Sequence, residues 1–186
     1  MVVRVENYNK IVDELERQEI INGGVLSNSE YAKLLAIYLY QNDLLSAKFL
    51  WKRIPLSTKS AAAELQSIWD VGKAMRRKEY DEIYISLKFP WSAEIKPLMQ
   101  MVEEEIRRNT LKLIAKSYSS LEIHKLSRYI GYDTQKTLAV AQENGWTNDG
   151  TYIFPNSQIM YITILSLLIN IDKLYTLLLW VNFLKL

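Results

Sequence analysis

The feature that most limits the fold of this chain is its scarcity of helix-breaking residues. Only six glycines and four prolines interrupt 186 residues, and the stretches between them have apolar residues at helical spacing. The first stretch, Val2–Ile21, precedes Gly23 and Gly24, and glycines there favour the end of a helix. The sequence therefore predicts an all-α fold with one small β element, a β wing, near residue 150.

Two helix–turn–helix units are predicted after the first helix. A serine at Ser27 or Ser29 is suited to cap the next helix, and Pro55 and Pro90 suit the ends of the two units. The turn of the first unit and the turn of the second are 36 residues apart, a spacing close to that of tetratricopeptide-like (TPR-like) repeats. The predicted helices of these units cover residues 31–40, 44–53, 61–77 and 81–88.

A longer helix is predicted over residues 96–120, and the pattern changes after it. A short amphipathic helix, capped by Ser119 or Ser120, is followed by one that begins at Asp133 and ends at Gly145. Asn148-Asp149-Gly150 is a hairpin signal. Two helices followed by a hairpin is the order of elements in a winged helix.

Composition removes several classes of function. The chain has no cysteine, which excludes thiol nucleophiles, disulfides and thiolate zinc sites. His124 is its one histidine, so neither H-x-H nor H-E-x-x-H occurs. The formal net charge of +2 is a weak electrostatic basis for binding nucleic acid. We therefore predict a protein that is not an enzyme and has no cofactor or metal.

Two segments resemble a known family. The runs "EYAKLLAIYLYQNDLLSAKFLWKRIP" and "ELQSIWDVGKAMRRKEYDEIY", with the later "ENGW", are similar to the small PCI-domain subunits of the COP9 signalosome. The resemblance spans roughly residues 27–155. Related small PCI subunits of the proteasome lid and of translation initiation factor three are the alternative.

The resemblance implies a scaffold. A PCI domain consists of helical repeats followed by a winged helix, here residues 1–120 and 121–157, with 158–186 as an apolar extension. The implied partners are the other PCI-domain subunits of the signalosome, which removes the ubiquitin-like protein Nedd8 from cullins through a different, catalytic subunit. The implied location is the cytoplasm and nucleus.

Two residues in the first unit are candidates for a docking site. Lys52 and Arg53 follow Trp51 at the end of a predicted amphipathic helix. They lie either on a solvated face, where charges contribute little to stability, or on a docking surface for an acidic patch of a partner. Trp51 is predicted to lie in the core, against Leu65 or Trp69 of the following helix.

The remaining candidates lie in the C-terminal third. Tyr152, Ile153 and Phe154 are predicted to form a sheet edge that a partner strand extends. The winged helix also raises a rival function, binding to nucleic acid through its second helix. The cations around it are few and spread out, so we predict no nucleic-acid partner.

The last 29 residues are strongly apolar and depart from the family, whose members carry a polar segment there. Leu165 and Leu168 are predicted to contact partner helices in a bundle. Two other interpretations stay open, a membrane-associated segment and a tail from an alternative transcript. A single membrane-spanning helix is disfavoured because Asp172 and Lys173 would lie near the bilayer centre.

Overall fold

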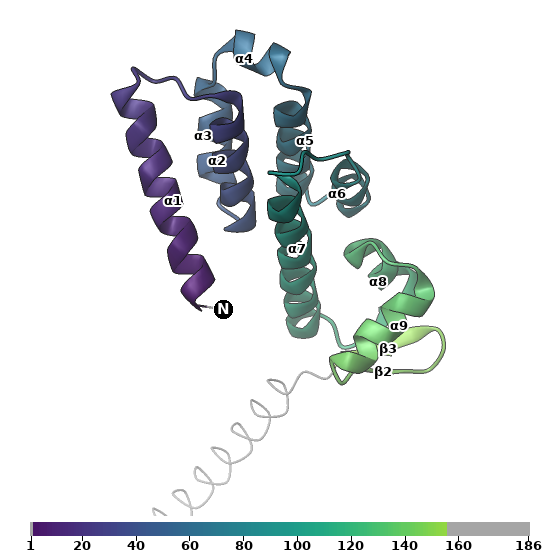
Figure 1. Cartoon of the computed structure of the whole chain (residues 1–186). Helices are drawn as coiled ribbons and strands as arrows, with labels where there is room; N and C mark the ends of the chain where they lie inside the picture. Colours follow the sequence, from purple (N-terminus) through teal and green to yellow (C-terminus); the bar gives the residue numbers. More distant parts are fainter. Residues whose placement is uncertain (1, 156–186) are drawn as a thin grey trace, which may run out of the picture. The chain divides into compact units, whose positions relative to one another are not determined.

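The computed structural model describes residues 2–155, with side chains from Tyr8 onward. It is mainly helical, with one small sheet near the end (Figure 1). The chain divides into two compact units, residues 2–110 with 127–132 and residues 111–126 with 133–155. The elements are α1 Val2–Ile21, α2 Asn28–Tyr40, α3 Leu44–Arg53, α4 Leu56–Ala61, α5 Ala63–Arg77, α6 Tyr80–Leu87, α7 Lys96–Ser117, β1 Leu121–Glu122, α8 Ile123–Ile130, α9 Thr134–Glu143, β2 Thr147–Asn148 and β3 Tyr152–Phe154.

Polar side chains set where the early helices begin. Ser27 and Glu30 form a capping box at the start of α2, in which the Ser27 backbone N–H donates to Glu30 Oε2 at 2.8 Å. Asp43 caps α3 by accepting a hydrogen bond from the Ser46 backbone N–H at 2.9 Å. The pKa of Glu30 is held below its ordinary value by hydrogen bonds from the Ser27 hydroxyl and backbone N–H, and the pKa of Asp43 is held below its ordinary value by those from the Ser46 backbone N–H and hydroxyl. The predicted serine cap is thereby confirmed at Ser27.

The two predicted helix–turn–helix units share one turn geometry. Asn42 and Lys78 both adopt the left-handed conformation, with φ of 57° and 59°. The Asp43 N–H donates to the Tyr38 carbonyl, and the Glu79 N–H donates to the Ala74 carbonyl. In both turns, the residue after the left-handed one donates an equivalent hydrogen bond to the preceding helix. The two turns are 36 residues apart, as expected from the sequence.

The core of the first unit is built around α2. Eight of the nine positions from Tyr31 to Leu39 are buried, and Lys33 is the exception. A helix that is apolar on all sides needs neighbours on all sides, and α2 contacts α1, α3 and α5. The short helix α4 was not predicted, because Pro55 was interpreted only as the end of α3.

The second unit contains a three-stranded antiparallel sheet in the order β1-β3-β2. Leu121 pairs with Ile153, and both side chains are buried. Strand β1 lies between the predicted cap residues, Ser119 and Ser120, and the start of α8 at Ile123, so the predicted serine cap is wrong. Asp133 does cap α9, and Gly145 follows it with a φ of 72°, as predicted.

Candidate interaction surfaces

Arg53 is an internal partner of α1 rather than a free surface cation. Its Nε and Nη2 donate to the two carboxylate oxygens of Glu19 at 2.8 and 2.7 Å. The Glu19 side chain is only 8% exposed, whereas that of Arg53 is 43% exposed. The hydrogen bond to Glu19 raises the pKa of Arg53 above its ordinary value, and burial opposes this shift in part. The pair joins the end of α3 to α1 across 34 residues of sequence.

A second polar contact lies beside this pair. The Tyr38 hydroxyl of α2 donates to Glu16 of α1, and burial together with this carboxylate raises the pKa of Tyr38. A cavity of about 490 Å³ opens here, lined by Glu16, Glu19, Ile20, Gly24 and Arg53. The carboxylates and the guanidinium that line this cavity already pair with groups of the same chain. We therefore interpret the cavity as part of a structural contact and not as a ligand site.

Lys52 differs from its neighbour. It is exposed, and among residues 8–155 no ion pair involves it. The two adjacent cations therefore have different roles. The prediction of a solvated or docking position stays open for Lys52. Arg53 instead pairs with a buried carboxylate, from which we expect a contribution to stability.

Trp51 is half-buried rather than fully in the core. Its ring stacks on that of Trp69, with the centroids 5.5 Å apart and the planes 11° from parallel. The Lys59 ammonium lies 5.1 Å from the Trp51 centroid on the remaining side. The predicted neighbour Trp69 is confirmed, but the predicted full burial is wrong, because a tryptophan at the end of a short helix keeps part of its ring at the surface.

The predicted sheet edge is also wrong. Strand β3, which holds Tyr152, Ile153 and Phe154, is the central strand and pairs with β1 on one side and β2 on the other. Its backbone hydrogen bonds are therefore used within the chain. Ile153 is fully buried, while Tyr152 and Phe154 are 40% and 38% exposed. These two aromatic side chains remain candidates for contact through the face of the sheet. Leu165 and Leu168 lie outside the described residues.

Residues 127–132, at the end of α8, are fixed within the first unit by a set of contacts that the sequence did not predict. Arg107 of α7 donates from Nε to the Ile130 carbonyl at 2.8 Å and also pairs with Glu103. Its guanidinium lies 4.1 Å from the ring centroid of Tyr132 and 5.2 Å from that of Tyr84. The Glu103–Arg107 pair agrees with helical spacing, which brings together side chains three or four residues apart, whereas the contacts of Arg107 with residues 130 and 132 have no such local signal.

Two further contacts complete this junction. Arg128 pairs with Asp81 of α6, with 3.1 Å between Nε and Oδ2, and this hydrogen bond holds the pKa of Asp81 below its ordinary value. Gly131 adopts a φ of +67°, and a Cβ built on it would lie 2.3 Å from the Tyr84 ring. The chain therefore passes closely over Tyr84, which only glycine permits.

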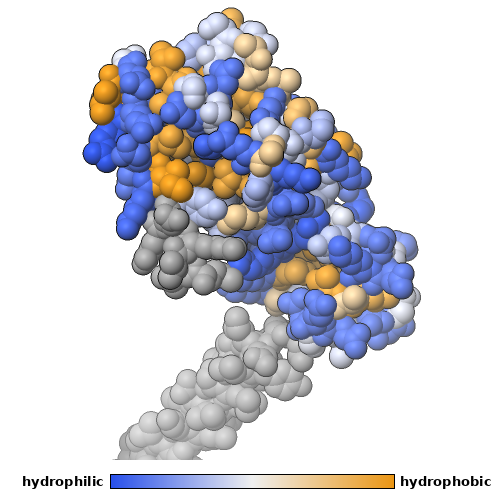
Figure 2. All heavy atoms as spheres, viewed as in Figure 1, coloured by the Kyte–Doolittle hydropathy of each residue, from blue (hydrophilic) through white to orange (hydrophobic). Residues whose placement is uncertain are grey.

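These contacts bear on the alternative functions. Arg107 and Arg128, two of the cations in and near the predicted winged helix, are engaged inside the first unit. Between residues 8 and 155, no three His, Cys, Asp or Glu side chains gather as they would around a metal ion. No helix within the described part of the chain is both long and apolar enough to cross a membrane. Figure 2 shows apolar residues scattered among charged ones on the visible surface of the first unit.

Comparison with known proteins places these features in a family. The model of the CSN8/PSMD8/EIF3K family matches residues 26–161. A relative from Xenopus tropicalis, named COP9 signalosome complex subunit 8, is 33% identical over 145 residues, which are 77% of this chain and 75% of the relative. Proteins of the same name from Danio rerio and Dictyostelium discoideum are 32% and 30% identical, over 80% of this chain and 78% and 76% of theirs.

Proposed function

The chain belongs to the CSN8/PSMD8/EIF3K family, and from this premise we propose that it is a non-catalytic scaffold subunit of a COP9 signalosome. The observation that carries the proposal is the similarity to subunit 8 proteins over about three quarters of both chains. Its role there is to support assembly of the complex that removes Nedd8 from cullins, as the resemblance implies. The same resemblance supports a location in the cytoplasm and nucleus.

The arrangement of side chains supports a role in binding rather than catalysis. Arg53 and Glu19 pair with each other beside the cavity of the first unit, so neither is available to act as an acid, a base or an electrophile. The first unit presents helix faces to solvent. Several of these faces carry exposed apolar side chains, as expected of a protein that is covered by neighbours in an assembly.

The helix pairs α2–α3 and α5–α6 are proposed to act as two TPR-like repeats. Their turns are equivalent at a spacing of 36 residues, with Asn42 and Lys78 in the same left-handed conformation. Stacked helix pairs present extended surfaces to partner chains. An exposed face of this array is therefore our candidate for contact with a neighbouring subunit.

Helices α8 and α9 with the β1-β3-β2 sheet are proposed to form the winged helix of a PCI domain. Since β3 is the central strand, a partner strand would add at the free side of β1 or β2 rather than at residues 152–154. Both outer strands are two residues long, so such augmentation would supply few hydrogen bonds and would need side-chain contacts in addition.

Affinity purification of the tagged full-length chain from its own cells, with mass spectrometry of the bound proteins, tests this function. We expect signalosome subunits to co-purify in near-equal amounts. Recovery of proteasome-lid or initiation-factor subunits instead would assign the chain to another branch of its family. Recovery of none of the three, together with salt-dependent binding to short duplex DNA, would favour the nucleic-acid-binding alternative.

A further inference from the structure

We infer that the outward face of α3 is a docking surface for an acidic amphipathic segment of another subunit. The α3 face consists of Leu45, Lys48, Phe49 and Lys52. The inference rests on the proposed function, because it requires an assembly in which such a neighbour exists. It replaces the pair Lys52 and Arg53 as the docking candidate, since Arg53 is occupied by Glu19.

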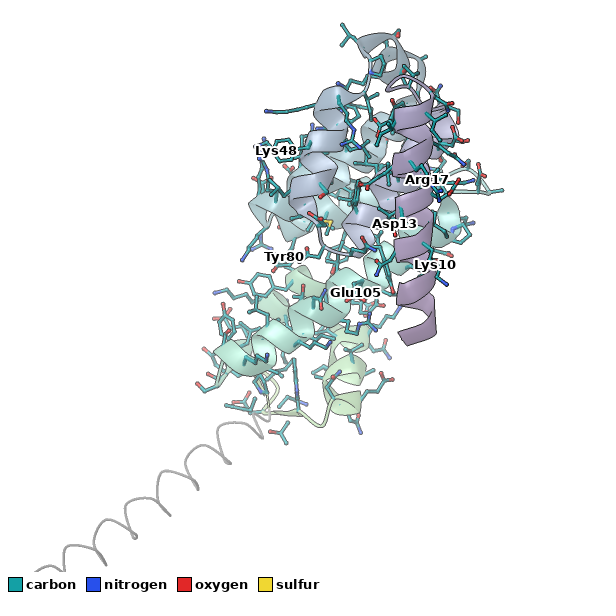
Figure 3. All side chains as sticks on the ribbon, turned by 90° about the vertical axis from the view of Figure 1, so that its left-hand side faces the viewer. Lys10, Asp13, Arg17, Lys48, Tyr80 and Glu105 are labelled. Atoms are coloured by element: carbon teal, nitrogen blue, oxygen red, sulfur yellow. The ribbon has the colours of Figure 1, made fainter. Side chains whose placement is uncertain are left out.

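The four residues lie on one side of the helix. At 100° per residue, they fall within an arc of about 100°. The opposite side packs inward: Ala47 and Leu50 are fully buried, and α3 contacts α2 and α5. In Figure 3, Lys48 lies well apart from the charged row of Lys10, Asp13 and Arg17 on α1. The α3 face is thus turned away from the packed side of its own helix.

The apolar part of this face consists of two large side chains that are more than half exposed. Leu45 is 62% exposed and Phe49 is 53% exposed. They are four residues apart, so their side chains adjoin and form one continuous patch. Ile20 and Ile21 are more exposed, at 79% and 74%, but consecutive residues point about 100° apart on a helix and do not form such a row. A phenylalanine and a leucine on adjacent turns are suitable anchors for a partner helix.

Charge indicates what kind of partner fits. Lys48 and Lys52 border the apolar pair, and among residues 8–155 neither forms an ion pair. Lys52 lies in the last turn of α3, where the helix dipole favours a cation, but Lys48 lies outside that turn. Two lysines beside an apolar pair match a helix that carries carboxylates beside its own apolar row.

The composition of the chain argues against its own tail as the occupant. Residues 156–186 contain one acidic residue, Asp172, and two lysines, Lys173 and Lys185. A second copy of the α3 face would bring lysines against lysines, which is unfavourable. An acid-rich segment of a different subunit satisfies both the apolar patch and its charged border.

Photo-crosslinking in the purified assembly tests this inference. The change is Phe49→p-benzoylphenylalanine in the full-length chain, with Ile85→p-benzoylphenylalanine as the control, because Ile85 is 68% exposed on α6. We expect position 49, above the level of the control, to crosslink to an acid-rich amphipathic segment of another subunit. Adding Lys48→Glu and Lys52→Glu should lower the yield about tenfold, while Lys88→Glu, directly after α6, leaves it unchanged.

Several outcomes would overturn the inference. The first kind is a crosslink to the wrong target, namely residues 156–186, a second copy of the chain, or a segment without excess acidic residues. The second kind is a crosslinking yield at position 49 that is no higher than at Ile85 or that does not change when the two lysines are reversed in charge. The proposed function is judged separately by whether the subunits co-purify at all. If they do not, the proposed function fails, and the docking surface fails with it. If they do and position 49 gives no crosslink, only the docking surface fails.

Discussion

At the scale of single residues, neighbours in the sequence prove to have unlike roles, and Lys52 and Arg53 are the clearest case. Both are cations at the end of α3, and both read as surface residues in the sequence. Their difference depends on Glu19, which lies 34 residues before Arg53. No helical spacing connects residues so far apart, so a single sequence does not show the pair.

Neutralising these two cations separately should therefore give unlike results. We expect Arg53→Gln to lower the free energy of unfolding by about 2–3 kcal/mol, because Glu19 is left buried without its charged partner. Lys52→Gln should change it by less than about 0.5 kcal/mol. Thermal melts of the two variants provide the measurement. Equal, small shifts would show that the Arg53–Glu19 pair does not stabilise the fold.

Gly131 and Gly145 offer a second matched pair. Both follow a helix and have positive φ, but a Cβ at Gly131 would meet the Tyr84 ring at 2.3 Å, whereas at Gly145 nothing lies within 4 Å. We expect Gly145→Ala to cost about 1 kcal/mol from backbone strain. Gly131→Ala should cost about 2–4 kcal/mol, since a clash with Tyr84 adds to the strain.

Chemical denaturation of both glycine variants measures the difference. A Gly131 variant as stable as the Gly145 variant would contradict the close passage of the chain over Tyr84. A third variant, Gly131→Ala with Tyr84→Ala, would regain part of the loss caused by the clash, although it also removes a buried ring.

At the scale of elements, local signals predicted most helix boundaries and failed where a partner is distant. Ser27 and Asp133 identified their helix starts because the capping interaction lies within three residues. Strand β1 has only two residues, Leu121 and Glu122, and exists through its pairing with β3 some thirty residues later. The central position of β3 follows from that same distant pairing, which is why the predicted edge was wrong.

The cap of α3 should make stability sensitive to acid. The Ser46 backbone and side-chain hydrogen bonds hold the pKa of Asp43 below its ordinary value of 3.8. Because the pKa is lower in the folded state, the ionised Asp43 contributes its full stabilisation of the folded state above pH 3.8. This contribution is lost as the pH falls through the folded-state pKa. We expect the difference in Tm between the natural protein and Asp43→Asn to shrink over that range. A difference that stays constant from pH 7 to pH 3 would argue against the charged cap.

The junction between α7 and residues 127–132 depends on the shape of Arg107 as well as its charge. Lysine keeps the charge but loses the planar group that lies on Tyr132 and the forked hydrogen bonds to Ile130 and Glu103. We expect Arg107→Lys to cost about 1–2 kcal/mol. The amides of Gly131 and Tyr132, which donate to the Ser127 carbonyl, should then exchange faster with solvent. Arg76→Lys, at an exposed position of α5, should leave this exchange unchanged.

At the scale of the whole molecule, the sequence predicted the class of fold and of function better than the sites. Helical periodicity, the shortage of glycine and proline and the motif around Trp51 led to a helical protein of a signalosome-like family, and the family comparison confirms that assignment. The individual candidates did less well, because an interface is a property of two surfaces. One chain shows which side chains are free, as for Lys52, or engaged, as for Arg53, but not what meets them.

The central claim is that this chain works as one subunit of a COP9 signalosome. Native mass spectrometry of the assembly purified through the full-length chain tests it most directly, because mass gives both the identity and the copy number of each subunit. We predict a complex that contains one copy of this chain with the other signalosome subunits. A complex built only of copies of this chain, or one composed of proteasome-lid or initiation-factor subunits, would contradict the account.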